Sequence, residues 1–379
     1  MSDLKQKLQQ LRRNLDQVSD RELSAVIGFD GFVDTIVEVV DKRHSFAEYT
    51  RMQTIADFGA RISRAAGLST NIEFVPVAKK LGGNGPIMAN AMMSLGVNVS
   101  YIGALGKPTI NQVFDSLVQG CAQVVSLAEP GLTDAVEFTD GKVMLGKITS
   151  LNEVTWDALV EAVGEDRIRE LFTSCDLVAT VNWTMMPHMN DIWENLLRVL
   201  PPNSDPDRPI LFVDLADPEK RKSEDILEAM RLIGRFNSVY RVALGLNRKE
   251  ATEVAEVLDL KLSAPAAEVS LEEITRALAD ALDLWCLMVH PTSAAAAVVD
   301  GVYAHTVGPY TSKPRLTTGA GDNFNAGFCL GLLLGLSLEQ CVMLGTATSG
   351  FYVRNMHSPS FAELKDFVEL WSQHGEVEF

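Results

Sequence analysis

The chain has 379 residues, of which 47% are hydrophobic and 22% are charged, and this composition predicts a compact globular protein and excludes a disordered one. The length suits one large α/β domain or two ordinary ones. A formal net charge of -17 excludes nucleic acid as the main partner, because such binding depends on Lys and Arg neutralising phosphates. An anionic substrate would therefore need a locally electropositive site.

The chain shows neither a disulfide framework nor a membrane segment. Its five cysteines are odd in number and form no C-x-x-C pair, which also argues against a zinc site (Cys121, Cys175, Cys286, Cys329 and Cys341). The charged N-terminus has no apolar segment typical of a signal peptide, and the most apolar stretch, 328–336, is too short to span a bilayer. We therefore predict a cytoplasmic protein that does not contact the membrane.

The first predicted element is an amphipathic helix over residues 1–20. Its apolar residues recur at near-heptad spacing and form one stripe (Leu4, Leu8, Leu11, Leu15 and Val18). Two interpretations stay open. The stripe either docks on the helix's own domain or forms a dimer contact.

From residue 24 onward, short apolar runs alternate with segments of helical periodicity. This alternation is typical of βαβ units, so it predicts an α/β fold with a mostly parallel sheet and helices on both faces. The predicted strands are 25–29, 99–105, 176–181, 210–215, 240–246 and 284–290.

Three further segments interrupt this alternation and predict a small β lid at the edge of the sheet. Residues 33–41 and 72–81 have the character of strands, and 134–148 is typical of a hairpin that turns at Asp140-Gly141. The segments 201–209 and 261–270 are interpreted as a loop and an insertion, not as domain linkers. We therefore expect one main domain over 21–379 that carries the lid.

The strongest functional motif is T-T-G-A-G-D-N-F, residues 317–324, which leads into a helix rich in small and apolar residues. Glycines allow backbone N–H groups to converge on one point, and a helix N-terminus adds partial positive charge there, so this turn is suited to an anion. Asp322 would then lie beside the anion and could accept a proton from an attacking hydroxyl. The alternative is that Asp322 only caps the helix.

T-G-A-G-D followed by N-F-N-A-G-F resembles the C-terminal signature of the ribokinase-like (PfkB) carbohydrate kinases, and the resemblance extends over about residues 24–372. It implies a ribokinase-like three-layer sandwich with a β lid. It also implies transfer of the terminal phosphoryl group of a nucleotide, ATP, to a hydroxyl of a sugar or related polyol. Asp322 would be the catalytic base, and the N–H groups of Gly319, Ala320 and Gly321 would stabilise the transferred phosphoryl group.

Two predicted strand ends supply candidate substrate ligands. In the family an aspartate after the first strand binds substrate hydroxyls, and Asp34 matches it best, with Asp30 close by. A carboxylate suits a polyol because each oxygen accepts from a hydroxyl. Asn182 ends another predicted strand on the ligand side of a parallel sheet and is a further candidate contact. The alternative for the two aspartates is a pair of solvated loop acids.

The segment G-G-N-G-P resembles the family's di-glycine substrate loop. It makes Gly82, Gly83 and Asn84 candidate substrate-binding residues, since glycines allow the backbone to approach a ligand closely. Ile87 stands where the family usually has Asn, so that contact is either missing or moved to Asn84. A plain turn between a strand and a helix is the alternative.

The segment N-R-K-E resembles the family's N-x-x-E motif, in which Asn and Glu organise Mg²⁺ and its waters. This gives Glu250 and Asn247 as the candidate magnesium residues, acting through water, with Asn247 also on the nucleotide side. A helix N-cap followed by a first-turn carboxylate explains the same four residues.

The remaining nucleotide-binding candidates are Thr292, Thr318 and Gly321. The family's glycine-containing turn is replaced here by H-P-T-S-A-A, residues 290–295, where the hydroxyls of Thr292 and Ser293 can compensate, and Leu316 replaces an aspartate that some relatives use for a monovalent cation. Residues 345–350 predict a helix of small residues that in relatives packs by the adenine, although close packing alone explains such residues.

The histidines show no ligand spacing, so we interpret them as structural (His188, His290, His305 and His357).

The expected partners are a polyhydroxylated small molecule and a nucleotide, with Mg²⁺ as cofactor. Pairing through the lid is frequent in this family, so a homodimer is one expectation. Two other hypotheses are a catalytically silent binding protein of the same fold and a dinucleotide-dependent oxidoreductase. The second lacks G-x-G-x-x-G after the first strand.

Overall fold

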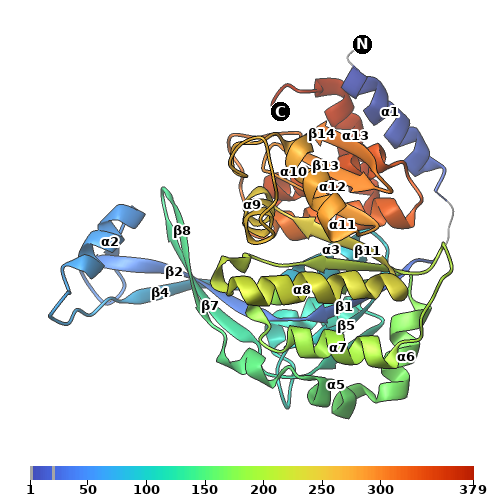
Figure 1. Cartoon of the computed structure of the whole chain (residues 1–379). Helices are drawn as coiled ribbons and strands as arrows, with labels where there is room; N and C mark the ends of the chain where they lie inside the picture. The colour runs from blue at the N-terminus through green and yellow to red at the C-terminus, as the bar shows by residue number, and fades with distance from the viewer. Residues whose placement is uncertain (1–2, 19–21) are drawn as a thin grey trace.

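A computed structural model describes residues 3–18 and 22–379 of the chain. Figure 1 shows a layered α/β body and a smaller β structure that projects from one side of it. The body is a three-layer sandwich in which helices cover both faces of a nine-stranded sheet. The predicted fold class is therefore confirmed.

The central sheet has the strand order β14-β13-β12-β11-β10-β9-β1-β5-β6. The seven strands from β12 to β6 run parallel to their neighbours, whereas β13 and β14 are antiparallel. Each of the six predicted strands corresponds to one of them. The strands are β1 (Ser24–Phe29), β5 (Asn98–Gly103), β6 (Gln123–Ser126), β9 (Leu177–Thr180), β10 (Ile210–Asp214), β11 (Arg241–Leu246), β12 (Cys286–Val289), β13 (Ala294–Val299) and β14 (Val302–Val307).

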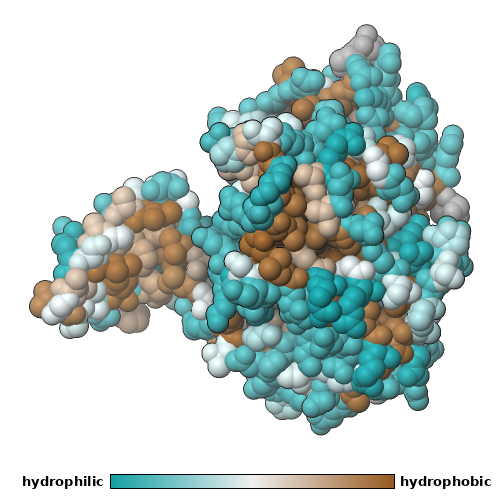
Figure 2. Space-filling model, in the orientation of Figure 1, coloured by the Kyte–Doolittle hydropathy of each residue, from teal (hydrophilic) through white to brown (hydrophobic). Residues whose placement is uncertain are grey.

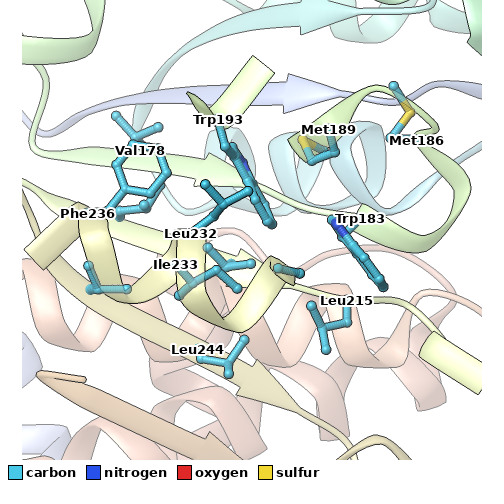
Figure 3. Packing of buried hydrophobic residues seen from close by; sticks show 14 of the residues in the cluster. Val178, Trp183, Met186, Met189, Trp193, Leu215, Leu232, Ile233, Phe236 and Leu244 are labelled. Atoms are coloured by element: carbon cyan, nitrogen blue, oxygen red, sulfur yellow. The ribbon is translucent and has the colours of Figure 1, made fainter. Parts of the chain in front are cut away.

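Alternate residues of the parallel strands pack into two hydrophobic cores, one on each face of the sheet. In β11, Val242 and Leu244 join one core while Ala243, between them, joins the other, as the period of two in a strand requires. Figure 3 shows part of the first core, where Trp193 and Leu232 meet over the sheet. Its helices are α5 (Trp156–Val163), α6 (Glu165–Ser174), α7 (Met189–Val199), α8 (Ser223–Arg235), α9 (Arg248–Val257) and α10 (Leu271–Leu282).

The helices on the opposite face include the element that follows the G-A-G-D motif. They are α1 (Asp3–Asp16), α3 (Asn84–Ser94), α4 (Asp115–Gly120), α11 (Ala320–Leu333), α12 (Leu338–Asn355) and α13 (Phe361–His374). Helix α11 packs against α12 and α3. The turn that starts α11 therefore lies beside the di-glycine segment that starts α3.

Helix α1 is the predicted amphipathic N-terminal helix. Leu8, Leu11 and Leu15 are buried, and the helix packs against α13 of its own chain (Figure 1). Of the two interpretations of the apolar stripe, docking on the helix's own domain is the one found. The helix ends at Asp16, before Val18, and residues 1–2 and 19–20 of the predicted range lie outside the described residues.

The projecting sheet contains the segments predicted as a lid. β2 pairs in parallel with β7 and antiparallel with β4 and β3, and β7 and β8 form a hairpin. Val37, Phe58 and Val136 contribute to a small core of its own. Its elements are β2 (Phe32–Arg43), β3 (Tyr49–Arg51), α2 (Ile55–Ser63), β4 (Phe74–Gly82), β7 (Gly131–Phe138) and β8 (Gly141–Lys147).

Some elements escaped the sequence analysis. Strands β13 and β14 form a hairpin at the sheet edge, and its turn places Asp300 and Gly301 at φ values of 49° and 76°. β13 begins at Ala294, inside the segment that we interpreted as the nucleotide-side turn. Among the described residues, no helix is long and apolar enough to cross a membrane.

Candidate active site

Two clefts meet at the turn that starts α11, beyond the carboxyl ends of the parallel strands. The first cleft, of about 740 Å³, lies between the body and the projecting sheet and is lined by Thr318, Gly319 and Asp322. The second cleft, of about 870 Å³, lies on the other side of the turn and is lined by Ala320 and Gly321. Ligands of open α/β sheets bind at this edge. One short segment thus faces both clefts.

Asp322 is a buried carboxyl group in the first turn of α11. Asn84 Nδ2, from the start of α3, donates to its Oδ1 at 2.9 Å. Burial raises the pKa of Asp322 to about 8, and the negative charges of Asp30 and Glu250 act in the same direction. The N-cap of α11 is Gly319, at φ 88°, so the alternative that Asp322 is only the helix cap is excluded.

Asp30 faces into the protein and anchors the start of α3. Its carboxylate accepts from the N–H groups of Asn84 at 2.9 Å and Gly85 at 2.8 Å, and from Asn182 Nδ2 at 2.6 Å. Burial raises its pKa to about 6 in spite of these hydrogen bonds. Asp30 does not line either cleft, so its immediate effect is to position Asn84 and Asn182.

Asp34, unlike Asp30, lines the first cleft. Burial raises its pKa, while a hydrogen bond with Thr133 and the charge of Lys142 oppose that rise. A Cβ on Gly82 would lie 2.4 Å from the Asp34 carboxyl carbon. Gly82 thus makes room for Asp34 without lining either cleft itself, whereas Gly83 does line the first one.

Asn182 lines the first cleft and offers a hydrogen-bond acceptor to it. Its backbone is left-handed, with φ 61°, and its Nδ2 is bound to Asp30. Its Oδ1 is buried and has no partner within the described chain. Since buried polar atoms are nearly always satisfied, this oxygen is suited to a hydroxyl donor of a ligand. Asn84 and Ile87 line the same cleft.

A lysine of the projecting sheet reaches the α11 turn. Lys142, on β8, donates a hydrogen bond to the Thr318 hydroxyl, and Tyr352 Oη donates to the Thr318 carbonyl at 2.8 Å. Burial lowers the pKa of Lys142. Thr318, a nucleotide-side candidate by sequence, lies on the first cleft and not on the second.

The N-x-x-E segment forms the helix cap that was one of its two interpretations. Asn247 and Glu250 make a capping box at the start of α9, and the Glu250 carboxylate also accepts from the Asp217 N–H at 2.9 Å. Glu250 is buried, which raises its pKa, and it lines the first cleft. A capping role does not exclude a second role, because each carboxylate oxygen accepts more than one hydrogen bond.

Asp214 is a buried aspartate close to Glu250 and Asp322 that sequence reasoning missed. It ends β10 and accepts from Asn325 Nδ2 at 2.9 Å, but its Oδ1 is buried and has no partner within the described chain. Burial, followed by the charges of Glu250 and Asp322, raises its pKa far above the usual value. The available signal was its place at the end of a predicted strand, the same signal that identified Asn182.

The second cleft brings together three of the candidates on the nucleotide side, Asn247, Thr292 and Gly321. It also reaches Thr346 and Gly350 of α12, which belong to the small-residue segment. The cleft therefore extends from the turn that starts α11 to α12.

Among the described residues, one acidic cluster at the border of the first cleft has the spacing of a metal site: Asp217, Glu219 and Glu253. Lys249 Nζ already lies 2.6, 2.5 and 3.4 Å from these three carboxylates. The lysine ammonium already pairs with all three carboxylates, so we do not assign a metal to the cluster.

Comparison with known proteins agrees with this geometry. The sequence model of the prokaryotic ketohexokinase family matches residues 2–371. A ketohexokinase from Haloferax volcanii is 31% identical over 347 residues, which cover 90% of each chain.

Solved structures share the fold at low sequence identity. Phosphofructokinase-2 from Escherichia coli, in complex with substrates and products, superposes with a TM-score of 0.63 at 14% identity, over 93% of this chain and 100% of that one. Ribokinase from Arabidopsis thaliana, complexed with ribose and ATP, gives 0.62 at 15% identity, over 92% and 98%. The chain belongs to the prokaryotic ketohexokinase family, and it is a sugar kinase with a ribokinase-like fold.

Proposed function

We propose that this protein transfers the terminal phosphoryl group of ATP to a hydroxyl of a ketohexose. The observation that carries the proposal is the place of Asp322, a buried carboxyl group at the turn where the two clefts meet. The family match and the Haloferax volcanii ketohexokinase support the choice of acceptor. We assign the first cleft to the sugar and the second to the nucleotide.

The acceptor cleft offers mainly hydrogen-bond acceptors, which suits a ligand rich in hydroxyl groups. Asn182 Oδ1 lacks a partner within the described chain, and the Asp34 carboxylate lines the same cleft. We propose that both accept from sugar hydroxyls and that Asp30 positions Asn182 and Asn84 for this purpose. Gly82 and Gly83 would contribute by letting Asp34 and the backbone come close.

Asp322 would act as the general base. A carboxylate with a raised pKa binds a proton more strongly than an exposed one, and it would take the proton of the attacking hydroxyl as the oxygen–phosphorus bond forms. Asn84 Nδ2 holds one carboxyl oxygen, which leaves the other directed to the acceptor. The pKa of about 8 also means that Asp322 must lose its own proton before it can act.

Backbone N–H groups at the start of α11 would stabilise the transferred phosphoryl group. The Ala320 N–H already donates to the Thr317 carbonyl at 3.1 Å. Within the described chain, the N–H groups of Gly319 and Gly321 have no partner, so they are the donors left for an anion. The partial positive charge of the helix N-terminus adds to their effect.

Two buried carboxyl groups beside the first cleft, Glu250 and Asp214, fit Mg²⁺. Asp214 Oδ1 has no partner within the described chain, and the buried Glu250 carboxylate lies close enough to raise the pKa of Asp214. Mg²⁺ prefers a few carboxylates together with water. We propose that Glu250 and Asp214 hold the ion through water, with Asn247 fixing Glu250. When bound, the ion would neutralise part of the nucleotide's charge.

The test is phosphorylation of a panel of ketohexoses, aldohexoses, pentoses and nucleosides, with ATP or ADP as donor and with or without Mg²⁺. We expect turnover with a ketohexose and ATP that needs Mg²⁺. In Asp322→Asn, kcat should fall by about a hundredfold to ten-thousandfold. Loss of general-base catalysis should leave the dissociation constant of the sugar nearly unchanged. Preference for another acceptor would refute the substrate, and an active Asp322→Asn variant would refute the base.

We also propose that the protein forms a homodimer through the projecting sheet. Leu132 and Leu145 are 45% and 40% exposed on the same face of β7 and β8, and Figure 2 shows hydrophobic residues over part of this sheet. Apolar side chains gathered in one place favour association. Light scattering of the wild type and of Leu145→Lys tests this, and a monomeric wild type would contradict it.

We propose a cytoplasmic location as well. All five cysteines are free, and all but Cys121 are buried. Free thiols are typical of proteins in a reducing compartment. Cell fractionation tests this directly, and recovery outside the cytoplasm would contradict it.

A further inference from the structure

His290 lies in the second cleft, beside the turn that starts α11. It follows β12, and its backbone N–H continues the pairing with β11 by donating to the Leu246 carbonyl at 2.9 Å. The imidazole stacks on Phe324 of α11, with ring centroids 4.8 Å apart and planes at 18°. His290 is partly exposed, and it lines the cleft with Gly321. The ring is therefore held against α11 while part of it stays open to the cleft.

The Cε1 corner of the ring, which lies between the two nitrogens, is the part nearest to Gly321 in the turn that starts α11. A Cβ on Gly321 would lie 3.4 Å from His290 Cε1, and Cε1 is the atom between Nδ1 and Nε2. Neither nitrogen has a hydrogen-bond partner in the described part of the chain. A structural histidine usually satisfies its polar atoms, so this ring has hydrogen-bonding capacity that the protein itself leaves unused.

The two cationic side chains of the second cleft, Arg248 and Lys249, are held by other groups. Arg248, which also lines it, donates to the carbonyls of Ala266, Ala267 and Val269 at 2.9, 3.2 and 2.7 Å. Lys249 is held by the acidic cluster described above. Pro291 has no N–H to offer. Arg248 Nη2 and Lys249 are thus engaged elsewhere, and the donors that remain in this cleft include the Thr292 hydroxyl and the ring nitrogens of His290.

From this placement we infer that His290 is a nucleotide-binding residue that donates a ring N–H to a phosphate oxygen of the nucleoside triphosphate. Burial lowers its pKa to about 4, so the imidazole is neutral near neutral pH and offers one donor and one acceptor. A neutral donor binds phosphate without a buried charge that must be compensated when the cleft is empty. The stack on Phe324 fixes the ring for this contact.

The inference rests on the proposed function only in assigning the second cleft to the nucleotide. The experiment therefore measures nucleotide binding without acceptor, by titration calorimetry with ATP and Mg²⁺, beside the KM values for ATP and for the sugar. The main variant is His290→Phe, which keeps a ring against Phe324 but removes both nitrogens. His305→Phe is the matched control, because His305 is exposed on β14 and does not line the cleft.

We expect His290→Phe to raise the dissociation constant and the KM for ATP about tenfold or more, as loss of a hydrogen bond to a charged group predicts. The KM for the sugar should change less than twofold, and His305→Phe should behave as the wild type. His290→Gln and His290→Asn each place an amide N–H near one ring nitrogen. One of them should restore ATP binding to within about threefold.

Unchanged ATP binding in His290→Phe would overturn the inference. Equal losses in the Phe, Gln and Asn variants would also overturn it, because they would point to packing and not to a donated hydrogen bond. Thermal unfolding identifies a variant that has lost its fold, and the remaining variants then decide. ATP binding is measured whether or not a ketohexose is phosphorylated, so failure of the acceptor assignment leaves this result interpretable.

Discussion

The two clefts that meet at α11 differ in the kinds of residues that form them. The acceptor cleft depends on buried polar groups that form a hydrogen-bonded network. Asp30 accepts from Asn84 and Asn182, and Asn84 donates to Asp322. The nucleotide cleft is lined mainly by helix starts, small residues, prolines and isolated hydroxyls such as that of Thr292.

The difference predicts how each cleft responds to substitution. A buried polar network loses several contacts when one member is removed, because the remaining groups stay buried without partners. An isolated hydroxyl at the rim of a cleft loses one contact. We therefore expect large effects on the acceptor side and small ones on the nucleotide rim, and the following predictions test this order.

Asp30→Ala should give the largest effect. It leaves the N–H groups of Asn84 and Gly85 and the Asn182 amide without their acceptor, so the free energy of unfolding should fall by about 3 to 5 kcal/mol. Urea denaturation at pH 7 measures it. Asp166→Ala, at an aspartate side chain that is 99% exposed, is the control and should leave stability nearly unchanged. Equal stability of the two variants would contradict the network.

Asp322→Asn should stabilise the protein, increasingly so as pH rises from 4 to 8. The folded carboxyl has a pKa of about 8 and the unfolded one about 3.9, so between these values the folded state binds the extra proton. The native stability contributed by that proton is complete below about pH 4 and is lost as pH rises to about 8. The amide of Asp322→Asn does not titrate in this range, so the variant does not lose stability in this way.

The gain in unfolding free energy of Asp322→Asn should grow by about 1 kcal/mol for each pH unit in that window. Urea unfolding of both proteins at pH 5, 6, 7 and 8 measures the difference. Asn84 Nδ2 can still donate to the amide oxygen, so the variant keeps that contact. A gain independent of pH would show that the raised pKa is not its source.

Gly82→Ala should weaken sugar binding without affecting the nucleotide. The added Cβ would lie 2.4 Å from the Asp34 carboxyl carbon, so Asp34 must move from its place in the acceptor cleft. The KM for the sugar should rise about tenfold, the usual order for one lost hydrogen bond to a charged group. Gly59→Ala, where a Cβ meets nothing within 4 Å, is the matched control. A larger change in the KM for ATP would reverse the assignment of the clefts.

Thr292→Val should give the smallest effect. It removes one exposed hydroxyl from the nucleotide cleft and keeps the shape of the side chain, so the KM for ATP should rise about two- to fivefold. Steady-state kinetics at saturating sugar measure it. A hundredfold rise in the KM for ATP would mean that Thr292 belongs to a hydrogen-bonded network as extensive as the one in the acceptor cleft.

Much of the fold was predictable because most strands and helices can be recognised from a short run of consecutive residues. The parallel strands are buried on both faces, so each gives a short apolar run such as 210–215. The hairpin of β13 and β14 was missed because its run of four alanines resembles neither an amphipathic strand nor a helix. The Asp300-Gly301 pair was nevertheless a usable turn signal.

The candidate site was predictable where a motif fixes the backbone and not where single side chains meet. The G-A-G-D turn and the di-glycine segment both announce helix starts, and the structure brings Asn84 and Asp322 together. Asp214 and His290 are single residues at strand ends, and the role of each depends on which helix packs beside it. Lys142 is distant in sequence from Thr318, and only the pairing of β7 with β8 and β2 carries it to the turn.

The contact between Lys142 and Thr318 has a consequence for the fate of ATP. It joins the projecting sheet to the turn that holds Asp322, the proposed base, and so ties the sheet to the place where we propose that the phosphoryl group is transferred. Water is the competing nucleophile at any such place, and an enclosed site keeps it out. A weaker contact between Lys142 and Thr318 should therefore raise the rate of ATP hydrolysis relative to the rate of sugar phosphorylation.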